Sequence, residues 1–579
     1  DFEINVTDPT LLTEGIIPEL EKLTPFSAKG KYDSEAKNIT LDMELAQVIY
    51  SKIVIDSFKL NINSDPQTLN CELKIAEVSN PTLKMENIFL ASQLHDNYIH
   101  FQLNTAKDDS TKMLAVSGNL KSIHETFNLK LEPALLLNNL NFTVDSSNYL
   151  VFGKAGIIAN NLILNHEKQK IAINSTEKEG QPPLEIKFTA FELQTLSKLI
   201  ENKKELVNGT IDGTVVLKKQ NQASTFTSDL TIKNLIFNEI PTGDVSLIAD
   251  NNENPKKYNV KLNLTGNQND IKMNGFYMAE FTEPYLNFIL DIKQLNLTTL
   301  EPYTFGQVTQ MSGMLNGKIN ITGNTMAPDL KGLLNFSSCN FRPKIIDSYL
   351  HVENEKIVFE SKKVLFNSFT LIDSLSNRAT IDGHVDIQNF KTIPFDLRLK
   401  TDNFLALNTT EKDNPLYFGT IYLDSDIKLK GTTQHPVINA KVGLNKGTLI
   451  TYVKPENTSA KNDSKGIVEF IDTIQIQRDI MTRRHADGQI STTTGISINA
   501  LINFDKDAEL KMLVDRLAGD SLYVKGSGQL EFAMDESGKM NLIGKYWIND
   551  GGYHLTINDF IKKNFTVAKG SSVTWSGDV

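Results

Sequence analysis

The chain of 579 residues is 40% hydrophobic and 22% charged, and its formal net charge is −11. This apolar content suffices for extensive burial and excludes a chain that is disordered throughout. The negative charge, without a clustered basic surface, excludes a nucleic-acid partner, because phosphate binding needs such a surface.

Cysteines and terminal features place further limits on the class of protein. The two cysteines, Cys71 and Cys339, cannot form a disulfide framework, and the sequence leaves open whether they pair with each other. No run approaches the roughly 20 apolar residues that span a bilayer, and no signal peptide is present. Because the chain begins at Asp1, we expect it to be a mature or excised piece, so the lack of a membrane anchor in it says little about the parent protein.

In chain order, a few short helices are expected among many strands. Helix candidates are Pro9–Leu23, Phe191–Leu206 and Leu297–Val308. Alternation of apolar and polar residues with period two predicts strands elsewhere, for example at Ser57–Asn63, Pro394–Lys400 and Ser521–Phe532. Polar turns predict hairpins within 258–278 and within 495–514. The sequence therefore predicts an all-β fold, a long antiparallel sheet with one apolar face and one polar face.

A repeat runs through the chain from about residue 208 onward. Similar strand starts contain Gly209, Gly313, Gly419 and Gly526, at spacings of about 105 residues. We expect segments at 1–190, 191–311, 312–417 and 418–579. Tandem β-sandwiches are the rival interpretation, but they usually carry a core tryptophan in each copy, and the only tryptophans here are Trp547 and Trp575.

The apolar face of a continuous sheet has to be shielded from water. The predicted helices are too few to do so, so the sheet either closes on itself or curls into a trough with an apolar inner wall. An open apolar groove of this kind suits hydrocarbon chains.

Residue patterns typical of catalysis or of metal and cofactor sites are missing from the sequence. The nine histidines have no metal-ligand spacing, and no phosphate-binding loop or nucleophile elbow occurs. Asp424 and Asp426 alternate with leucine and isoleucine, so we interpret them as the wetted face of a strand. A mobile loop is expected near 454–466. The sequence thus predicts a protein that is not an enzyme and binds no metal or cofactor.

The last third of the chain carries a family resemblance. The segments Phe404–Glu456 and Gly526–Asp578 resemble the TamB family, in the form found in Bacteroidetes-type bacteria. The family's closing pattern is similar to the residues found here at Gly551, Gly552, Tyr553, Phe565, Val567, Gly570, Ser571, Val573, Trp575, Gly577 and Asp578. The family usually continues beyond this pattern and begins with a membrane helix, so the resemblance implies a segment truncated at both ends.

The resemblance implies a β-taco, a curled sheet that is anchored in the inner membrane and crosses the periplasm of a Gram-negative bacterium. TamB-like proteins are grouped with AsmA-like, bridge-type lipid transfer proteins. The implied roles are phospholipid transport to the outer membrane and outer-membrane protein assembly or secretion with a BamA-like or TamA-like barrel partner.

Two functions follow as hypotheses, with a tandem-sandwich surface adhesin as a weaker third. In the first, the chain is a lipid conduit. In the second, it is an assembly scaffold whose strand edges pair with client strands. Residues expected to contact acyl chains in the conduit are Val260, Leu262, Ile319, Ile321, Ile427, Leu429, Ile496, Ile498, Ile502, Phe504, Leu510, Met512, Val573 and Trp575.

Overall fold

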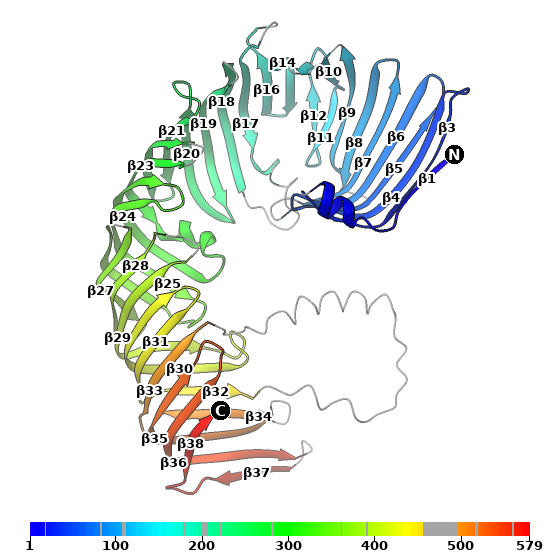
Figure 1. The fold of residues 1–579 in the computed structure, drawn as a ribbon. Helices are drawn as coiled ribbons and strands as arrows, with labels where there is room; N and C mark the ends of the chain where they lie inside the picture. The colour runs from blue at the N-terminus through cyan, green and yellow to red at the C-terminus, as the bar shows by residue number, and fades with distance from the viewer. Residues whose placement is uncertain are drawn as a thin grey trace, which may run out of the picture. The chain divides into compact units, whose positions relative to one another are not determined.

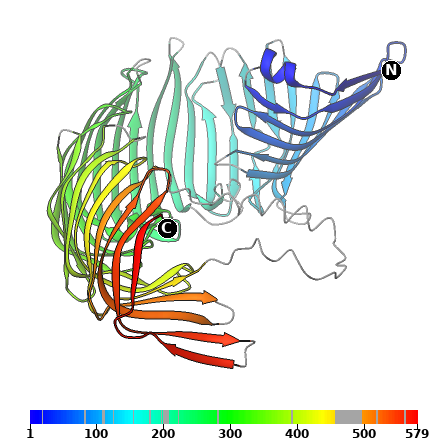
Figure 2. The ribbon, with the colours of Figure 1, turned by 60° about the horizontal axis from the view of Figure 1, so that its bottom comes forward.

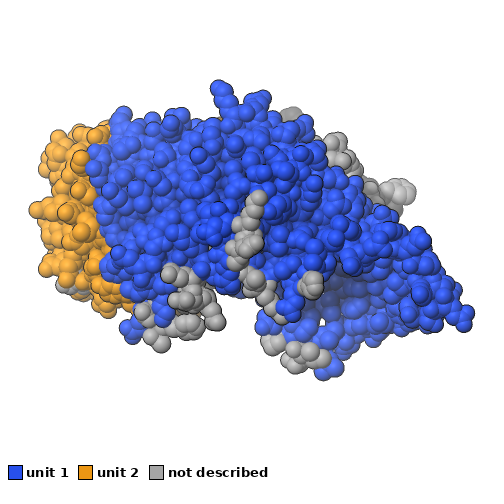
Figure 3. Space-filling view, turned by 90° about the horizontal axis from the view of Figure 1, so that it is seen from above, with its two compact units in different colours: residues 1–284 blue, residues 285–579 orange. Residues whose placement is uncertain are grey.

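A computed structural model shows an all-β protein that divides into two compact units, Asp1–Pro284 (unit 1) and Tyr285–Val579 (unit 2) (Figure 3). The boundaries expected from the repeat stay predictions. The structure describes residues 1–17, 19–80, 84–106, 112–123, 125–153, 156–177, 181–195, 197, 207–220, 223–279, 283–360, 362–388, 392–454, 495–515, 519–557 and 561–578.

In unit 1 each strand pairs with its neighbours in an antiparallel ladder (Figure 1). Its elements are β1 (Phe2–Val6), a π-helical turn η1 (Leu11–Ile16), β2 (Leu20–Leu23), β3 (Phe26–Asp33), β4 (Asn38–Tyr50), β5 (Ile53–Ser64), β6 (Thr68–Ser79), β7 (Lys84–His95), β8 (Tyr98–Ala106), β9 (Lys112–Ile123), β10 (Thr126–Leu131), β11 (Ala134–Leu137), β12 (Leu140–Val144), β13 (Tyr149–Gly153), β14 (Gly156–Asn160), β15 (Leu162–His166), β16 (Gln169–Ser175), β17 (Leu184–Glu192), β18 (Val207–Gln220), β19 (Ala223–Phe237), β20 (Ile240–Asp250), β21 (Lys257–Gly266) and β22 (Asn269–Met278).

Unit 2 is also built of paired strands, most of them antiparallel, and its long strands are visibly curved (Figure 2). Its elements are β23 (Tyr285–Asn296), a 3₁₀-helix η2 (Leu297–Thr304), β24 (Val308–Asn324), β25 (Asp329–Pro343), β26 (Leu350–Glu360), β27 (Lys363–Asp373), β28 (Arg378–Asp386), β29 (Pro394–Thr409), β30 (Tyr417–Thr432), β31 (Pro436–Leu444), β32 (Leu449–Val453), β33 (Ser497–Phe504), β34 (Glu509–Asp515), β35 (Asp520–Met534), β36 (Met540–Ile557), β37 (Ile561–Thr566) and β38 (Ser572–Asp578).

The long strands bend at a recurring irregularity. At the bend one residue adopts a positive φ, and its amide donates to Oδ1 of an aspartate on the next strand, an arrangement that we call the latch. A β-bulge of this kind increases local twist and turns the strand. The latches join Ala190 to Asp212 (2.8 Å), Asn234 to Asp244 (2.7 Å), Ser368 to Asp382 (2.7 Å) and Asn403 to Asp424 (2.7 Å).

Removal of one latch should weaken the fold measurably. In Asp382→Ala, the amide and hydroxyl of Ser368 lose their shared acceptor, and we expect the free energy of unfolding to fall by about 1–2 kcal/mol. The control is Asp396→Ala, which removes only an exposed ion pair with Lys430 and should cost less than about 1 kcal/mol. Urea unfolding of both variants would measure the difference, and equal losses would contradict a special role for the latch.

Beyond a bend, the two halves of one strand can pair with different partners. Residues 423–431 of β30 pair with β31, whereas residues 417–420 pair with β32. β31 and β32 thus act as one bent strand, and β33 and β34 form a second, because both pair with β35. The hairpin expected within 495–514 is therefore wrong. Asp505–Ala508 bends the chain without reversing it, because β35 offers partners on both sides of the bend. The expected hairpin within 258–278 is confirmed as β21–β22.

Two neighbouring pairs of strands in unit 2 are parallel rather than antiparallel. β33 pairs in parallel with β31, and β34 with β32. Parallel neighbours need a crossover between them rather than a tight turn. The loop expected at 454–466 belongs to this connection, and all of it after Lys454 lies outside the described residues, as does most of the helix expected at 191–206.

The other two helix predictions hold in shortened form. In the helix expected at Pro9–Leu23, helical structure ends at Ile16. Leu20–Leu23 forms a strand instead, because these residues pair with the end of β4. The helix expected at Leu297–Val308 is confirmed as η2, which ends at Thr304. At the start of η2 the Asn296 side chain accepts a hydrogen bond from the Thr298 amide.

Two clusters of buried apolar side chains form cores. In unit 1 a core forms from Leu135, Leu137, Phe142, Val144, Leu162, Phe191 and Ile211. In unit 2 a smaller core contains Leu350, Ala379 and Phe404. These cores stabilise the bent strands by removing apolar area from water, at about 25 cal/mol per Å².

Candidate functional site: an apolar strip on one face of each unit

Directly paired residues of neighbouring strands point to the same face of a sheet, so the register shows which side chains align. In unit 2 two rows cross six or more strands without a polar side chain. We call them the apolar strip of unit 2. They are Ile381–Leu399–Ile427–Ala440–Ala500–Phe532–Leu542 and Leu397–Leu429–Ile438–Ile498–Met534–Met540.

Unit 1 has equivalent rows, the apolar strip of unit 1. The first is Ala28–Met43–Leu60–Leu73–Leu90–Leu103–Val116. The second is Val144–Leu164–Ile171–Phe188–Gly213–Leu230–Leu247–Leu262–Met273.

Most side chains of both strips are neither buried nor fully exposed. Leu397, Leu399, Ile427, Leu429, Ile438 and Ile498 are all of this intermediate kind, as are Met43, Leu60, Leu73, Leu90 and Leu103. The inner face of a β-sandwich would be buried by its second sheet. The strips are therefore apolar surfaces that the chain itself covers only in part, which disfavours the tandem sandwich.

The register places the residues expected to contact acyl chains on these apolar faces. Leu262, Ile427, Leu429 and Ile498 belong to the strips. Val260, Ile319, Ile321, Ile502, Phe504, Leu510, Met512, Val573 and Trp575 share the face of their unit's strip through adjacent rows, and Ile319 among them is buried. Ile496 directly precedes β33. Contact of any of them with lipid stays a prediction.

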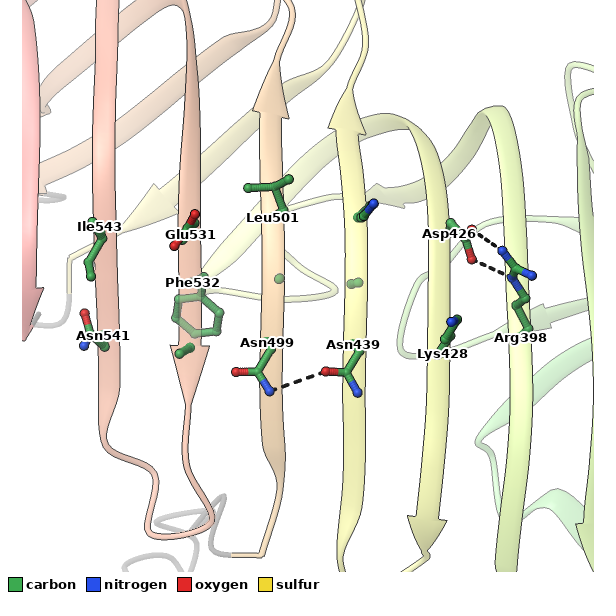
Figure 4. Close-up of a pocket in the computed structure, with 14 residues that line it drawn as sticks. Arg398, Asp426, Lys428, Asn439, Asn499, Leu501, Glu531, Phe532, Asn541 and Ile543 are labelled. Atoms are coloured by element: carbon green, nitrogen blue, oxygen red, sulfur yellow. Dashed lines mark hydrogen bonds and ion pairs between the residues drawn. The ribbon is translucent and has the colours of Figure 1, made fainter.

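The opposite face of unit 2 is polar and carries a shallow cavity of about 620 Å³. Figure 4 shows its lining, in which Arg398 forms a two-pronged ion pair with Asp426 (Nε to Oδ1, 2.8 Å) and the amide of Asn499 donates to Asn439. Hydrogen bonds from Arg398 lower the pKa of Asp426 below its usual range. The interpretation of Asp426 as part of a wetted face is thus consistent with the structure, but Asp424 also serves a latch.

The charged side chains that line the cavity on the polar face largely compensate one another, so they favour neither an anionic nor a cationic ligand. The cations are Arg398, Lys428 and Lys441, and the anions are Asp426 and Glu531. Because opposite charges compensate one another here, the arrangement suits a structural ion network better than an anion site.

Sequence reasoning missed Tyr546, which lies on the apolar face of β36. The side chain is only 3% exposed, its ring contacts Phe504 edge-on, and its hydroxyl finds no hydrogen-bond partner among the described residues. Burial raises the pKa of Tyr546 to about 12, so the hydroxyl stays protonated near neutral pH. Its neighbours Gly526 and Gly528, visible in the sequence, make room for the ring; a Cβ on Gly526 would lie 2.9 Å from it.

An unpaired buried hydroxyl destabilises a fold. Tyr546→Phe should leave the free energy of unfolding unchanged or raise it by up to about 1 kcal/mol, because it removes an unsatisfied polar group without opening a cavity. Urea unfolding measures this, with Tyr523→Phe on the same sheet as a comparison. A loss of more than about 1 kcal/mol in Tyr546→Phe would show that the hydroxyl has a partner.

Structural features of other classes of site were sought as well. Within the described ranges, no group of three or more His, Cys, Asp or Glu side chains is placed to hold a metal ion. The helices in that part of the chain are too short to cross a membrane. Cys71 and Cys339 are both free thiols, and burial raises the pKa of Cys339.

The closing stretch of the sequence forms the last three strands. Tyr553 of β36 pairs with Phe565 of β37, and Trp575 of β38 pairs with Gly544. Gly551 and Gly552 are buried where the Tyr523 carbonyl and ring approach closely, and Gly570 and Ser571 form a turn that bonds to Ile548. Gly577 and Asp578 pair with the start of β36. These residues therefore form the strands and the turn at this end of unit 2.

Comparison with known proteins bears on this same region. No curated protein and no solved structure matches the chain. A family model, described as the TamB C-terminal domain, matches residues 367–579, which include β28 to β38 and the larger part of the apolar strip of unit 2. Residues 367–579 of the chain therefore match the TamB C-terminal domain.

Proposed function

We propose that the chain is a segment of a non-enzymatic lipid conduit, in which acyl chains lie along the apolar strips while headgroups stay in water. The TamB C-terminal domain supports a role in outer-membrane assembly or lipid transport at the level of the family. Phospholipid as cargo, a periplasmic location, an inner-membrane anchor and a barrel partner in the outer membrane are parts of the same proposal.

The single observation that carries the proposal is the unbroken, partly exposed apolar strip. In the row through Ile427, Ala440 and Ala500 no polar side chain interrupts the strip from β28 to β36. Each methylene that moves from water to such a surface gains about 0.8 kcal/mol. Because this gain is similar at every strand, a lipid can move along the strip without falling into a deep trap.

Photo-crosslinking tests the proposal directly. A benzophenone amino acid at Ile498 points into the strip, whereas the same probe at Asn499 points to the polar face. We expect lipid adducts at Ile498 and few at Asn499, detected by mass spectrometry after irradiation of the protein in cells. Equal adduct yields at the two positions would refute a one-sided lipid conduit.

The scaffold for outer-membrane proteins remains a second candidate, favoured by the edge of β38. Among the described strands, β38 pairs with β36 alone, so its other edge can accept a further strand. Probes at Thr574 and Ser576 would then crosslink to nascent barrel proteins rather than to lipid. This outcome, together with the absence of lipid at Ile498, would replace the conduit by the scaffold.

A further inference from the structure

The apolar face of unit 1 ends in a lysine at one rim. Along β18 the residues on this face are Gly213, Val215, Leu217 and then Lys219, the last before the rim where β18 ends and β19 begins. Leu217 pairs with Phe226, and Lys219 pairs with Ser224. A lysine in this position covers apolar neighbours with its methylene stem and holds its ammonium group at the water boundary.

Aromatic rings follow the same rim. Phe226 of β19, Tyr258 of β21 and Tyr277 of β22 follow one another with ring centroids 6.0 and 5.9 Å apart. Aromatic side chains with one apolar and one polar end are typical of the boundary between hydrocarbon and headgroups. The rim thus changes from apolar to polar over one or two residues.

A cavity of about 450 Å³ opens beside this rim. Among the described residues, Lys218, Lys219, Thr225, Gln181, Pro183 and Asn252 line it, so the described lining contains two cations and no carboxylate. Neither lysine forms an ion pair in the described part of the chain. In the cavity on the polar face of unit 2, by contrast, Asp426 and Glu531 compensate the cations.

The chain around Thr225 and Asn252, two residues that line the cavity beside the lysines, is held in place by a buried side-chain amide. Asn251 is 1% exposed, and its Oδ1 accepts from the Phe226 amide (2.6 Å). Its Nδ2 donates to the carbonyl oxygens of Pro255 (2.9 Å) and Ser224 (3.3 Å). These bonds connect the backbone on either side of Thr225 to the segment that carries Asn252.

We propose that this cavity binds a phosphate group through Lys218 and Lys219, and that the phosphate is the headgroup of a lipid whose acyl chains lie against Leu217 and Phe226. The lipid source of the phosphate rests on the proposed conduit; free phosphate shares the chemistry of the headgroup. Lys218 and Lys219 follow each other on β18 and reach the cavity from opposite faces of the strand. An ammonium group forms a charge-assisted hydrogen bond with an anion, which is stronger than a neutral one.

Calorimetric titration of the full chain separates these sources with three probes. They are dihexanoylphosphatidylglycerol, dihexanoylglycerol, which has the same acyl chains without phosphate, and inorganic phosphate. We expect the phosphate-bearing lipid to bind at least about tenfold more tightly than dihexanoylglycerol. Lys219→Gln and Lys218→Gln should each remove most of that preference. Lys261→Gln, an exposed lysine on the polar face of β21, should leave it intact.

Each outcome decides one part of the proposal. Equal affinity for the two lipids, in the original protein and in both variants, would overturn the phosphate site and leave the conduit standing. Binding of inorganic phosphate that Lys219→Gln abolishes, with neither lipid bound, would support the phosphate site and overturn both its lipid source and the conduit. Unchanged melting temperatures would confirm that these exposed substitutions leave the fold intact.

Discussion

The variant Ile427→Glu is expected to lose most of the lipid that co-purifies with the original protein. Ile427 stands between Leu399 and Ala440 in the middle of the apolar strip of unit 2. An ionised carboxylate cannot give up its water without a partner, so it keeps the strip wet where an acyl chain would lie. Quantitative lipid mass spectrometry of the purified protein measures the loss.

The neighbouring substitution Lys428→Glu is the matched control. It introduces the same carboxylate one residue away, on the polar face, and should leave bound lipid unchanged. A second variant, Ala500→Phe, fills the strip without adding charge and should also reduce bound lipid. If Ile427→Glu keeps its lipid while its fold is intact by circular dichroism, the strip does not carry the cargo.

Gly419→Ala is expected to destabilise the protein by about 3 kcal/mol. Gly419 lies in β30 with φ +132°, and a Cβ there would stand 2.1 Å from the Leu449 carbonyl oxygen. The substitution combines an unfavourable backbone conformation with a clash against the paired backbone of β32, which can give way only if the pairing opens. Denaturant unfolding followed by tryptophan fluorescence measures the loss.

The variant Gly577→Ala separates the effect of the backbone conformation from the effect of the clash with a neighbouring strand. Its φ is +149°, close to that of Gly419, but no atom lies within 4 Å of the added methyl group. We therefore expect a loss of only about 1 kcal/mol from the backbone conformation. Similar losses in both variants would show that the close approach between β30 and β32 contributes nothing.

Close packing at three glycines of the repeat explains why the repeat is visible in the sequence. Gly313, Gly419 and Gly526 each lie where the carbonyl of the neighbouring strand is too close for any side chain, between 2.0 and 2.4 Å from an added Cβ. The chain can satisfy this requirement only with glycine, so the residue recurs with the bent strands. Period-two alternation likewise placed Ile427, Leu429 and Ile498 on one face before any pairing was known.

Features that depend on non-local pairing could not be predicted. The polar turn after Phe504 resembles a hairpin loop, and only the presence of β35 along both β33 and β34 makes it a bend. The latch aspartates were also missed, although Thr210–Gly213 and Thr380–Gly383 repeat the same four residues, TIDG. An aspartate on a strand can face water or accept an amide from a neighbour, and alternation does not distinguish the two.

The latch has a consequence for how such a sheet can change in length. Each bend is fixed by bonds between two adjacent strands, as in Asn403 with Asp424, and needs nothing from the rest of the sheet. Insertion of one hairpin with its own latch would lengthen the sheet by about 10 Å, two strand spacings, and keep every side chain on its original face. A sheet of this design can therefore gain or lose hairpins with no redesign of the strands already present.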